Sequence, residues 1–274
     1  MGLFEKLHVR REKHQPEKKD SEKRIDVMLA LAESLLHDGK AEQAIEQYKR
    51  ILQLCPNSTA QYSLGSLLAQ GKGIQQDFCE GAYYFHQAEK NGDEVASKLV
   101  LKCELDYICQ DIEKRSYAEL YEKMKWFVTR VYSEDATEEH IGRELSTIGM
   151  HLLNKKQYAE AVKLLRAAAE FCDYGQAQNY LGVLYNAGIG VEKNDLISLY
   201  WFDRATDNGF EASRQDRDGL FNAYLNTLSE DEFVEYMEHI ARWCEIGTED
   251  IPRTLDKVEY WHRVAHKKSL PVQV

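Results

Sequence analysis

A set of glycine, aromatic and alanine positions recurs in this chain at a distance of 117 residues. The pairs are Leu64/Leu181, Gly65/Gly182, Gly71/Gly188, Gly73/Gly190, Tyr84/Trp201, Phe85/Phe202, Ala88/Ala205 and Gly92/Gly209. Self-similarity at a fixed distance is the signature of repeat architectures, in which each unit buries its apolar face against its neighbours. We therefore expect a tandem duplication, with a first copy over residues 25–132 and a second copy over residues 142–274.

Apolar residues recur at helical spacing within each copy. Leu31, Leu35 and Leu36 share one predicted helix face, and Ala44 and Tyr48 share the next. No proline occurs between residues 57 and 251, whereas an all-β domain of this size would need prolines at its many turns. The sequence therefore predicts an all-α fold built from helical hairpins.

Two kinds of hairpin alternate in each copy. Residues 25–56 resemble a tetratricopeptide repeat (TPR), with Ala32, Ala44, Tyr48 and Pro56 at the signature positions. Residues 60–92 and 177–209 resemble the longer-looped Sel1-like repeat (SLR), and residues 250–265 resemble the back half of a third, degenerate one. This resemblance implies a right-handed α-solenoid superhelix of stacked TPR/SLR-like antiparallel helical hairpins, running as one continuous solenoid through both copies.

Particular residues are expected to shape these helices. Gly65 and Gly182 would permit close helix packing, and the glycines at 71, 73, 188 and 190 would occupy loop conformations costly for other residues. Capping boxes are expected where a serine precedes Gln or Glu by three positions, at Ser58, Ser116 and Ser229, and Thr137 marks another helix start.

Charge divides the chain into a basic end and an acidic array. The net charge of the chain is −11. Residues 1–24 carry a net charge of +3, so the net charge of the remaining 250 residues is −14. An acidic surface repels phosphates, which argues against a nucleic acid partner. We expect residues 1–24 to form a charged, mobile tail, either solvated or making a short basic amphipathic contact, and residues 133–141 to form an acidic connector.

The expected location is the cytoplasm. No apolar run is long enough for a membrane-spanning helix, and the first 20 residues lack the pattern of a secretory signal. The six cysteines form no CxxC pair, which indicates reduced thiols.

No catalytic, cofactor or metal motif stands out. The Gly71/Gly73 and Gly188/Gly190 pairs follow helices and lack a third glycine, so we expect interhelical loops rather than a phosphate site. His262 and His266 have no third ligand nearby and are expected to be solvated. We expect a non-enzyme without cofactor or metal. The alternative is a β-lactam-binding or hydrolysing enzyme, as the resemblance to cysteine-rich secreted SLR proteins would imply, but the paired cysteines and signal peptide of that type are missing.

The first helices of TPR hairpins line a concave groove, so the resemblance places candidate partner-binding residues on them. The predicted groove residues are Glu33, Tyr62, Ser66 and Gln70 in the first copy and Arg143, Met150, Asn154, Asn179 and Asn186 in the second, with Asp26, Leu29, His37, Ser146 and Val183 at further groove positions. The asparagines suit hydrogen bonds to a partner's backbone. We expect a protein–protein interaction scaffold whose protein or peptide partner the sequence does not identify. Solvation of the groove and assembly into a homodimer stay open as alternatives.

Overall fold

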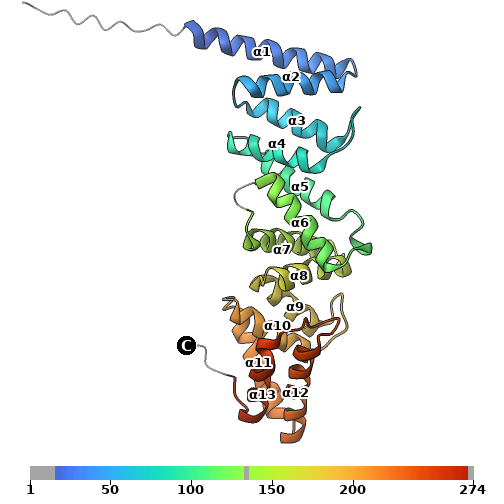
Figure 1. Ribbon diagram of the computed structural model, residues 1–274, viewed down its shortest axis with the longest axis vertical. Helices are drawn as coiled ribbons and strands as arrows, with labels where there is room; N and C mark the ends of the chain where they lie inside the picture. The colour runs from blue at the N-terminus through green and yellow to red at the C-terminus, as the bar shows by residue number, and fades with distance from the viewer. Residues whose placement is uncertain (1–15, 133–135, 271–274) are drawn as a thin grey trace, which may run out of the picture. The chain divides into compact units, whose positions relative to one another are not determined.

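The computed structural model describes residues 16–132 and 136–270, with side chains from Asp20 onward. Every regular element in these residues is helical. The elements are α1 (Pro16–His37), α2 (Ala41–Leu54), α3 (Ser58–Gln70), α4 (Phe78–Lys90), α5 (Ala96–Ile108), the short 3-10 helix η1 (Ile112–Lys114), α6 (Tyr117–Tyr132), α7 (Glu138–Asn154), α8 (Tyr158–Phe171), α9 (Gly175–Ala187), α10 (Asp195–Asp207), α11 (Ser213–Thr227), α12 (Glu230–Ile246) and α13 (Leu255–Lys267) (Figure 1).

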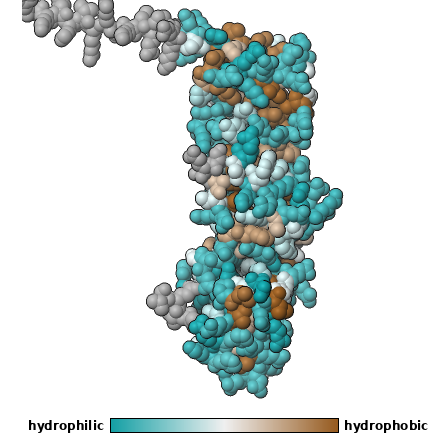
Figure 2. All heavy atoms as spheres, in the orientation of Figure 1, coloured by the Kyte–Doolittle hydropathy of each residue, from teal (hydrophilic) through white to brown (hydrophobic). Residues whose placement is uncertain are grey.

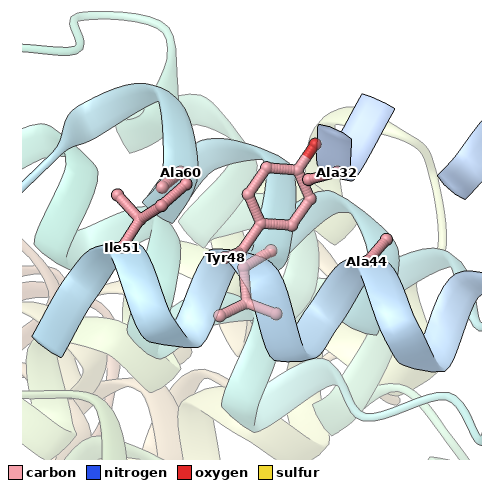
Figure 3. Close-up of a cluster of buried hydrophobic side chains, with 6 residues drawn as sticks. Ala32, Ala44, Tyr48, Ile51 and Ala60 are labelled. Carbon is pink, nitrogen blue, oxygen red and sulfur yellow. The ribbon is translucent and has the colours of Figure 1, made fainter. Parts of the chain in front are cut away.

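The chain forms two compact units, Met1–Cys103 (unit 1) and Glu104–Val274 (unit 2). In unit 1, α1 pairs with α2, α2 packs on α3, and α3 pairs with α4. The core between the first three helices centres on the buried Tyr48, whose ring projects from α2 toward Ala32 of α1 (Figure 3). Small residues at 32, 44 and 60 make room for this ring, so the aromatic side chain fills the space between helices.

Unit 2 repeats this scheme with additional helices. The hairpins are α7 with α8, α9 with α10, and α12 with α13, while α6 packs on α7 and α8, and α11 packs on α10. The sequence duplication assigns α6 to the first copy, but in the structure it belongs to unit 2. The boundary between the units falls inside α5.

The described residues confirm the predicted all-α solenoid of stacked helical hairpins. A single right-handed superhelix through both units stays a prediction. Residues 1–15 of the expected tail and 133–135 of the expected connector lie outside the described residues, and the rest of these two segments contributes to α1 and α7. None of the described helices combines the length and apolarity that crossing a membrane requires.

The paired glycines act as predicted. A Cβ at Gly182 would lie 2.6 Å from the ring of Phe202, and one at Gly65 would lie 3.0 Å from both Phe85 and the Gly81 carbonyl oxygen. Gly71 and Gly188 end α3 and α9 in the left-handed conformation, with φ of 66° and 67°. The same two devices therefore set hairpin spacing and helix ends in both copies.

Three of the four expected helix caps are confirmed. Ser116 and Ser229 exchange hydrogen bonds with Glu119 and Glu232 as capping boxes, and Thr137 Oγ1 accepts from the His140 amide. The prediction of Ser58 is wrong, because Asn57 caps α3 and its Oδ1 accepts from the Ala60 amide at 2.8 Å. Asn57 follows Pro56 with extended backbone angles, which suit a helix cap.

Gly182→Ala is expected to destabilise the protein by about 1–3 kcal/mol, because the added methyl group overlaps the Phe202 ring. Gly219→Ala is the matched control, since this helical glycine has nothing within 4 Å of an added Cβ. The control should gain up to about 1 kcal/mol from helix propensity. Urea unfolding measures both, and unchanged stability of Gly182→Ala would contradict the role given to this contact.

A buried acid lies near the start of unit 2. Glu104 is 2% exposed and accepts a hydrogen bond of 3.0 Å from Tyr132 Oη. Burial raises the pKa of Glu104 to about 8, the neighbouring Glu144 carboxylate also raises it, and the Tyr132 hydrogen bond acts in the opposite direction. At neutral pH Glu104 is therefore mostly protonated.

Glu104→Gln is expected to change how stability depends on pH. Because the folded pKa of Glu104 lies above the ordinary 4.5, its contribution to stability is fully present below that value and is lost as pH rises through about 8. The variant keeps an acceptor for Tyr132 and has no carboxylate to ionise, so above pH 8 it should exceed the wild type by on the order of 4 kcal/mol. Chemical unfolding across pH tests this, with the exposed Glu122→Gln on α6 as control. Parallel pH profiles for wild type and Glu104→Gln would contradict it.

Candidate functional site

The predicted groove residues of unit 1 lie on α1 and α3, and we call Glu33, Tyr62, Ser66 and Gln70 the inner face of unit 1. Glu33 and Gln70 are exposed, and Tyr62 and Ser66 are half-buried. Asp26 and His37 are exposed as well, whereas Leu29 packs against the Tyr48 cluster. The face therefore presents polar groups above an apolar floor.

Tyr62 contacts the core beneath this face, and the carboxylate of Glu33 acts electrostatically on the buried Tyr48. The Tyr62 ring meets the Phe85 ring edge-on, with centroids 5.7 Å apart. Burial raises the pKa of the Tyr48 phenol, a hydrogen bond with Ser63 lowers it, and the Glu33 carboxylate raises it.

The predicted groove residues of unit 2 lie on α7 and α9, and we call Arg143, Met150, Asn154, Asn179 and Asn186 the inner face of unit 2. Arg143 and Asn154 are exposed, and the other three are half-buried. Val183 of α9, at a further predicted groove position, is 42% exposed. Ser146 is buried with an unbonded Oγ and does not reach this face, which corrects its prediction as a groove residue.

Asn179 and Asn186 each use one of the two polar atoms of the side-chain amide in a hydrogen bond within the protein. Asn179 Oδ1 accepts from Ser213 Oγ at 2.7 Å, and Asn186 Nδ2 donates to Asp195 Oδ1 at 3.2 Å. Among the described residues, Asn179 Nδ2 and Asn186 Oδ1 make no hydrogen bond. One oriented donor and one oriented acceptor thus stand on α9, seven residues or roughly 10 Å apart along the helix.

The positive charge of this face is partly offset. Arg143 Nε lies 3.4 Å from Glu144 Oε1, and the same oxygen lies 3.4 Å from His140 Nε2. Arg143 stays exposed despite this contact. The inner face of unit 2 therefore carries amides, one cation and apolar surface.

Other candidate sites found in the sequence have structural roles. The Gly71/Gly73 and Gly188/Gly190 pairs lie in the loops between α3 and α4 and between α9 and α10. His262 Nδ1 lies 2.7 Å from Glu238 Oε2, and His266 Nε2 lies 3.7 Å from Glu238 Oε1. Within the described residues, no group of three or more His, Cys, Asp or Glu side chains is arranged to hold a metal ion.

Sequence reasoning missed a set of buried charges in unit 2. Arg166 is 2% exposed and donates to the carbonyl oxygens of Glu249, at 2.9 Å, and of Asp250. Asp203 is fully buried and accepts from Lys257 Nζ at 2.7 Å. We call residues 248–257, which link α12 to α13 and begin α13, the docking segment. The contacts of Arg166 and Asp203 hold this segment against α8 and α10. The signal in the sequence was one arginine, Arg166, inside the otherwise apolar residues 164–169.

Comparison with known proteins matches the family model "Sel1 repeat" to residues 58–93 and 175–210. These are the two glycine-paired hairpins, α3–α4 and α9–α10. The degenerate C-terminal repeat lies outside the matched residues. Among curated proteins, no sequence matches this chain.

Three solved structures are similar at low sequence identity. A protective antigen of uropathogenic Escherichia coli with an SLR fold is 15% identical, with a TM-score of 0.34, and the match covers 92% of this chain but only 56% of that one. A Sel1 repeat protein from Oxalobacter formigenes is 19% identical, with a TM-score of 0.28 and coverage of 93% and 89%. A putative sel1 repeat protein from Klebsiella pneumoniae is 14% identical, with a TM-score of 0.28 and coverage of 75% and 96%.

The repeated residues, the helical hairpins and the family match agree. Gly65 and Gly182 lie where a helix crosses its partner within the two matched segments, and the left-handed Gly71 and Gly188 end the first helix of each. The chain contains two Sel1 repeats, at residues 58–93 and 175–210.

Proposed function

We propose that this chain is a non-enzymatic scaffold that binds an extended segment of a partner protein on its inner faces. Sel1 repeats generally mediate protein interactions, which supports the class of function. Stacked helical hairpins offer long surfaces whose exposed side chains are independent of the core. The specific residues follow from the geometry of α9.

The observation that carries this proposal is that the amides of Asn179 and Asn186 each have one polar atom in an internal hydrogen bond and the other without a partner among the described residues. Each internal hydrogen bond orients one amide, so little side-chain entropy remains to be lost on binding. Their separation of roughly 10 Å corresponds to about three residues of extended chain. A partner backbone laid along α9 would accept from Asn179 Nδ2 and donate to Asn186 Oδ1, without a requirement on its side chains.

Apolar side chains supply the remaining contacts. Val183 lies between the two asparagines on α9, and Met150 is half-buried on α7. In unit 1, Tyr62 offers an aromatic surface already fixed against Phe85. Rigid aromatic and flexible thioether surfaces suit binding of varied apolar side chains.

Substitution of both asparagines by alanine tests the proposal. Asn179→Ala/Asn186→Ala should lower partner affinity about tenfold or more, since two net hydrogen bonds are lost. Affinity capture with mass spectrometry should show proteins that bind the wild type and the control Arg242→Ala, exposed on α12, but not the double variant. Titration of peptides from those proteins then gives the affinities. An identical set of bound proteins for double variant and wild type would reject this site.

The state of the cysteines supports a reducing, cytoplasmic location as part of this proposal. No disulfide joins the cysteines of the described residues. Burial raises the pKa of the Cys172 and Cys244 thiols to about 12, so both are protonated and unreactive at neutral pH. The β-lactam alternative rests on paired cysteines and has no support in this arrangement.

Self-association is a second proposal, because apolar side chains reach the surface beside α1 and α2 (Figure 2). Val27 is 68% exposed, Leu31 47% and Leu54 55%. A second copy covering them would bury apolar area. Light scattering should then show a dimer that Leu31→Glu converts to a monomer, and a monomeric wild type would reject it.

A further inference from the structure

Unit 1 contains a cavity of about 560 Å³ that is lined by residues of α2, α3 and α4 and by none of the inner-face residues. Its lining residues are Lys49, Leu52, Gln53, Pro56, Gln61, Tyr83, Tyr84, Gln87, Lys90 and Asn91. Two of them are lysines and none is acidic, although the chain as a whole carries a net charge of −11. Lys49 and Lys90 are exposed, and neither forms an ion pair within the described residues.

The duplication identifies the counterpart of this cavity in unit 2. At the distance of 117 residues, Lys49 corresponds to Arg166, Tyr83 to Tyr200 and Lys90 to Asp207. One hydrogen bond is the same in both units, because Asn91 Nδ2 donates to Gln61 Oε1 at 2.9 Å and Asn208 Nδ2 donates to Gln178 Oε1 at 2.9 Å. The unit 1 cavity and its counterpart in unit 2 therefore share the same glutamine–asparagine hydrogen bond.

In unit 2 this counterpart is occupied by the docking segment. Arg166 binds two of its backbone carbonyl oxygens, and Tyr200 Oη lies 2.8 Å from Thr254 Oγ1. Asp203 and Asp207 both bind Lys257 Nζ at the start of α13. The chain thus shows what this surface accepts, which is a loop that leads into a helix with a charged residue in its first turn.

The charges that receive Lys257 are replaced in unit 1. His86 stands at the position of Asp203, and Lys90 stands at the position of Asp207. The acidic residues Glu170 and Asp173 become Gln53 and Pro56. A site that is acidic in unit 2 is therefore basic in unit 1, and a lysine in the helix of the occupant would be repelled there.

The amide of Gln61 also lines the unit 1 cavity. Gln61 is 6% exposed, and within the described residues its Nε2 donates no hydrogen bond. The corresponding Gln178 Nε2 donates to the Ala169 carbonyl oxygen at 3.1 Å and to Asp173 Oδ1 at 3.4 Å. Because Pro56 replaces Asp173, Gln61 lacks that carboxylate acceptor, and an acidic occupant would supply one.

We infer that the unit 1 cavity is a docking site for an acidic loop-and-helix segment of a partner protein, shaped like residues 248–257 but with a carboxylate where Lys257 stands. Lys49 would bind backbone carbonyl oxygens of the loop, as Arg166 does, and Lys90 would pair with the carboxylate of the helix. The site uses α2 and α4 rather than the inner faces, so it is separate from the proposed binding along α9 and stands or falls independently.

The chain's own segment provides the probe. Two fluorescein-labelled peptides of residues 247–264, one native and one with Lys257→Glu, are titrated with the full-length protein, and fluorescence anisotropy is recorded. The Lys257→Glu peptide should bind on the order of tenfold more tightly than the native peptide. Its glutamate would pair with Lys90, whereas Lys90 would repel the lysine of the native peptide. The protein variant Lys90→Asp should reverse this preference, whereas Lys98→Asp, an exposed lysine on α5, should leave it unchanged.

Three outcomes would overturn the inference. The first is that neither peptide binds, and the second is that Lys90→Asp binds both peptides as the wild type does. The third is tighter binding of the native peptide together with a Lys90-dependent dimer in light scattering, which would make a second copy of this chain the occupant. Circular dichroism of both exposed-lysine variants establishes that they remain folded. Failure of the Asn179→Ala/Asn186→Ala experiment affects none of these results, since those residues lie on α9.

Discussion

Contact between helices without an intervening side chain is the constraint on which both repeats depend. At Gly182 the ring of Phe202 occupies the space that a Cβ would need, and at Gly65 both Phe85 and the Gly81 carbonyl oxygen would lie 3.0 Å from a Cβ. Because backbones this near fix the angle of the hairpin, they also fix which faces of its helices remain exposed. The inner-face residues on α9 belong to the α9–α10 crossing in unit 2, and the cavity beside α4 belongs to the equivalent α3–α4 crossing in unit 1.

Most of the fold could be predicted from local sequence patterns. The glycine pairs, the helix periodicity and the caps at Ser116, Thr137 and Ser229 depend on residues within a few positions, so they can be read without tertiary information. The misassigned cap at Ser58 shows the limit of that reading, since the adjacent Asn57 offers an equally good acceptor and its backbone angles decide between them. The packing of α6 in unit 2 was also out of reach, because duplication records ancestry of sequence and not which neighbour a helix packs on.

The candidate site was less predictable than the fold. The TPR resemblance placed Asn179 and Asn186 on one helix face, but not their bonds to Ser213 and Asp195, which join residues 34 and nine positions apart in sequence. Ser146 sits at a nominal groove position and is buried. Arg166 gave no sign of its role, because the carbonyl groups it binds lie more than 80 positions away. Position within a repeat predicts orientation, whereas burial and partners depend on contacts distant in sequence.

Duplication followed by divergence explains how equivalent surfaces in the two units can have different occupants. The Gln61–Asn91 and Gln178–Asn208 bonds preserve the geometry of the surface, so changes at 86 and 90 alter its charge without altering the packing beneath. In unit 2 the buried Asp203 is paired with Lys257 and Arg217, and an ionised carboxylate removed from water is costly unless it is paired. That requirement ties the surface of unit 2 to its own docking segment. Exposed Lys49 and Lys90 carry no such requirement, since solvent stabilises both charges, and the unit 1 surface can remain open until a partner covers it.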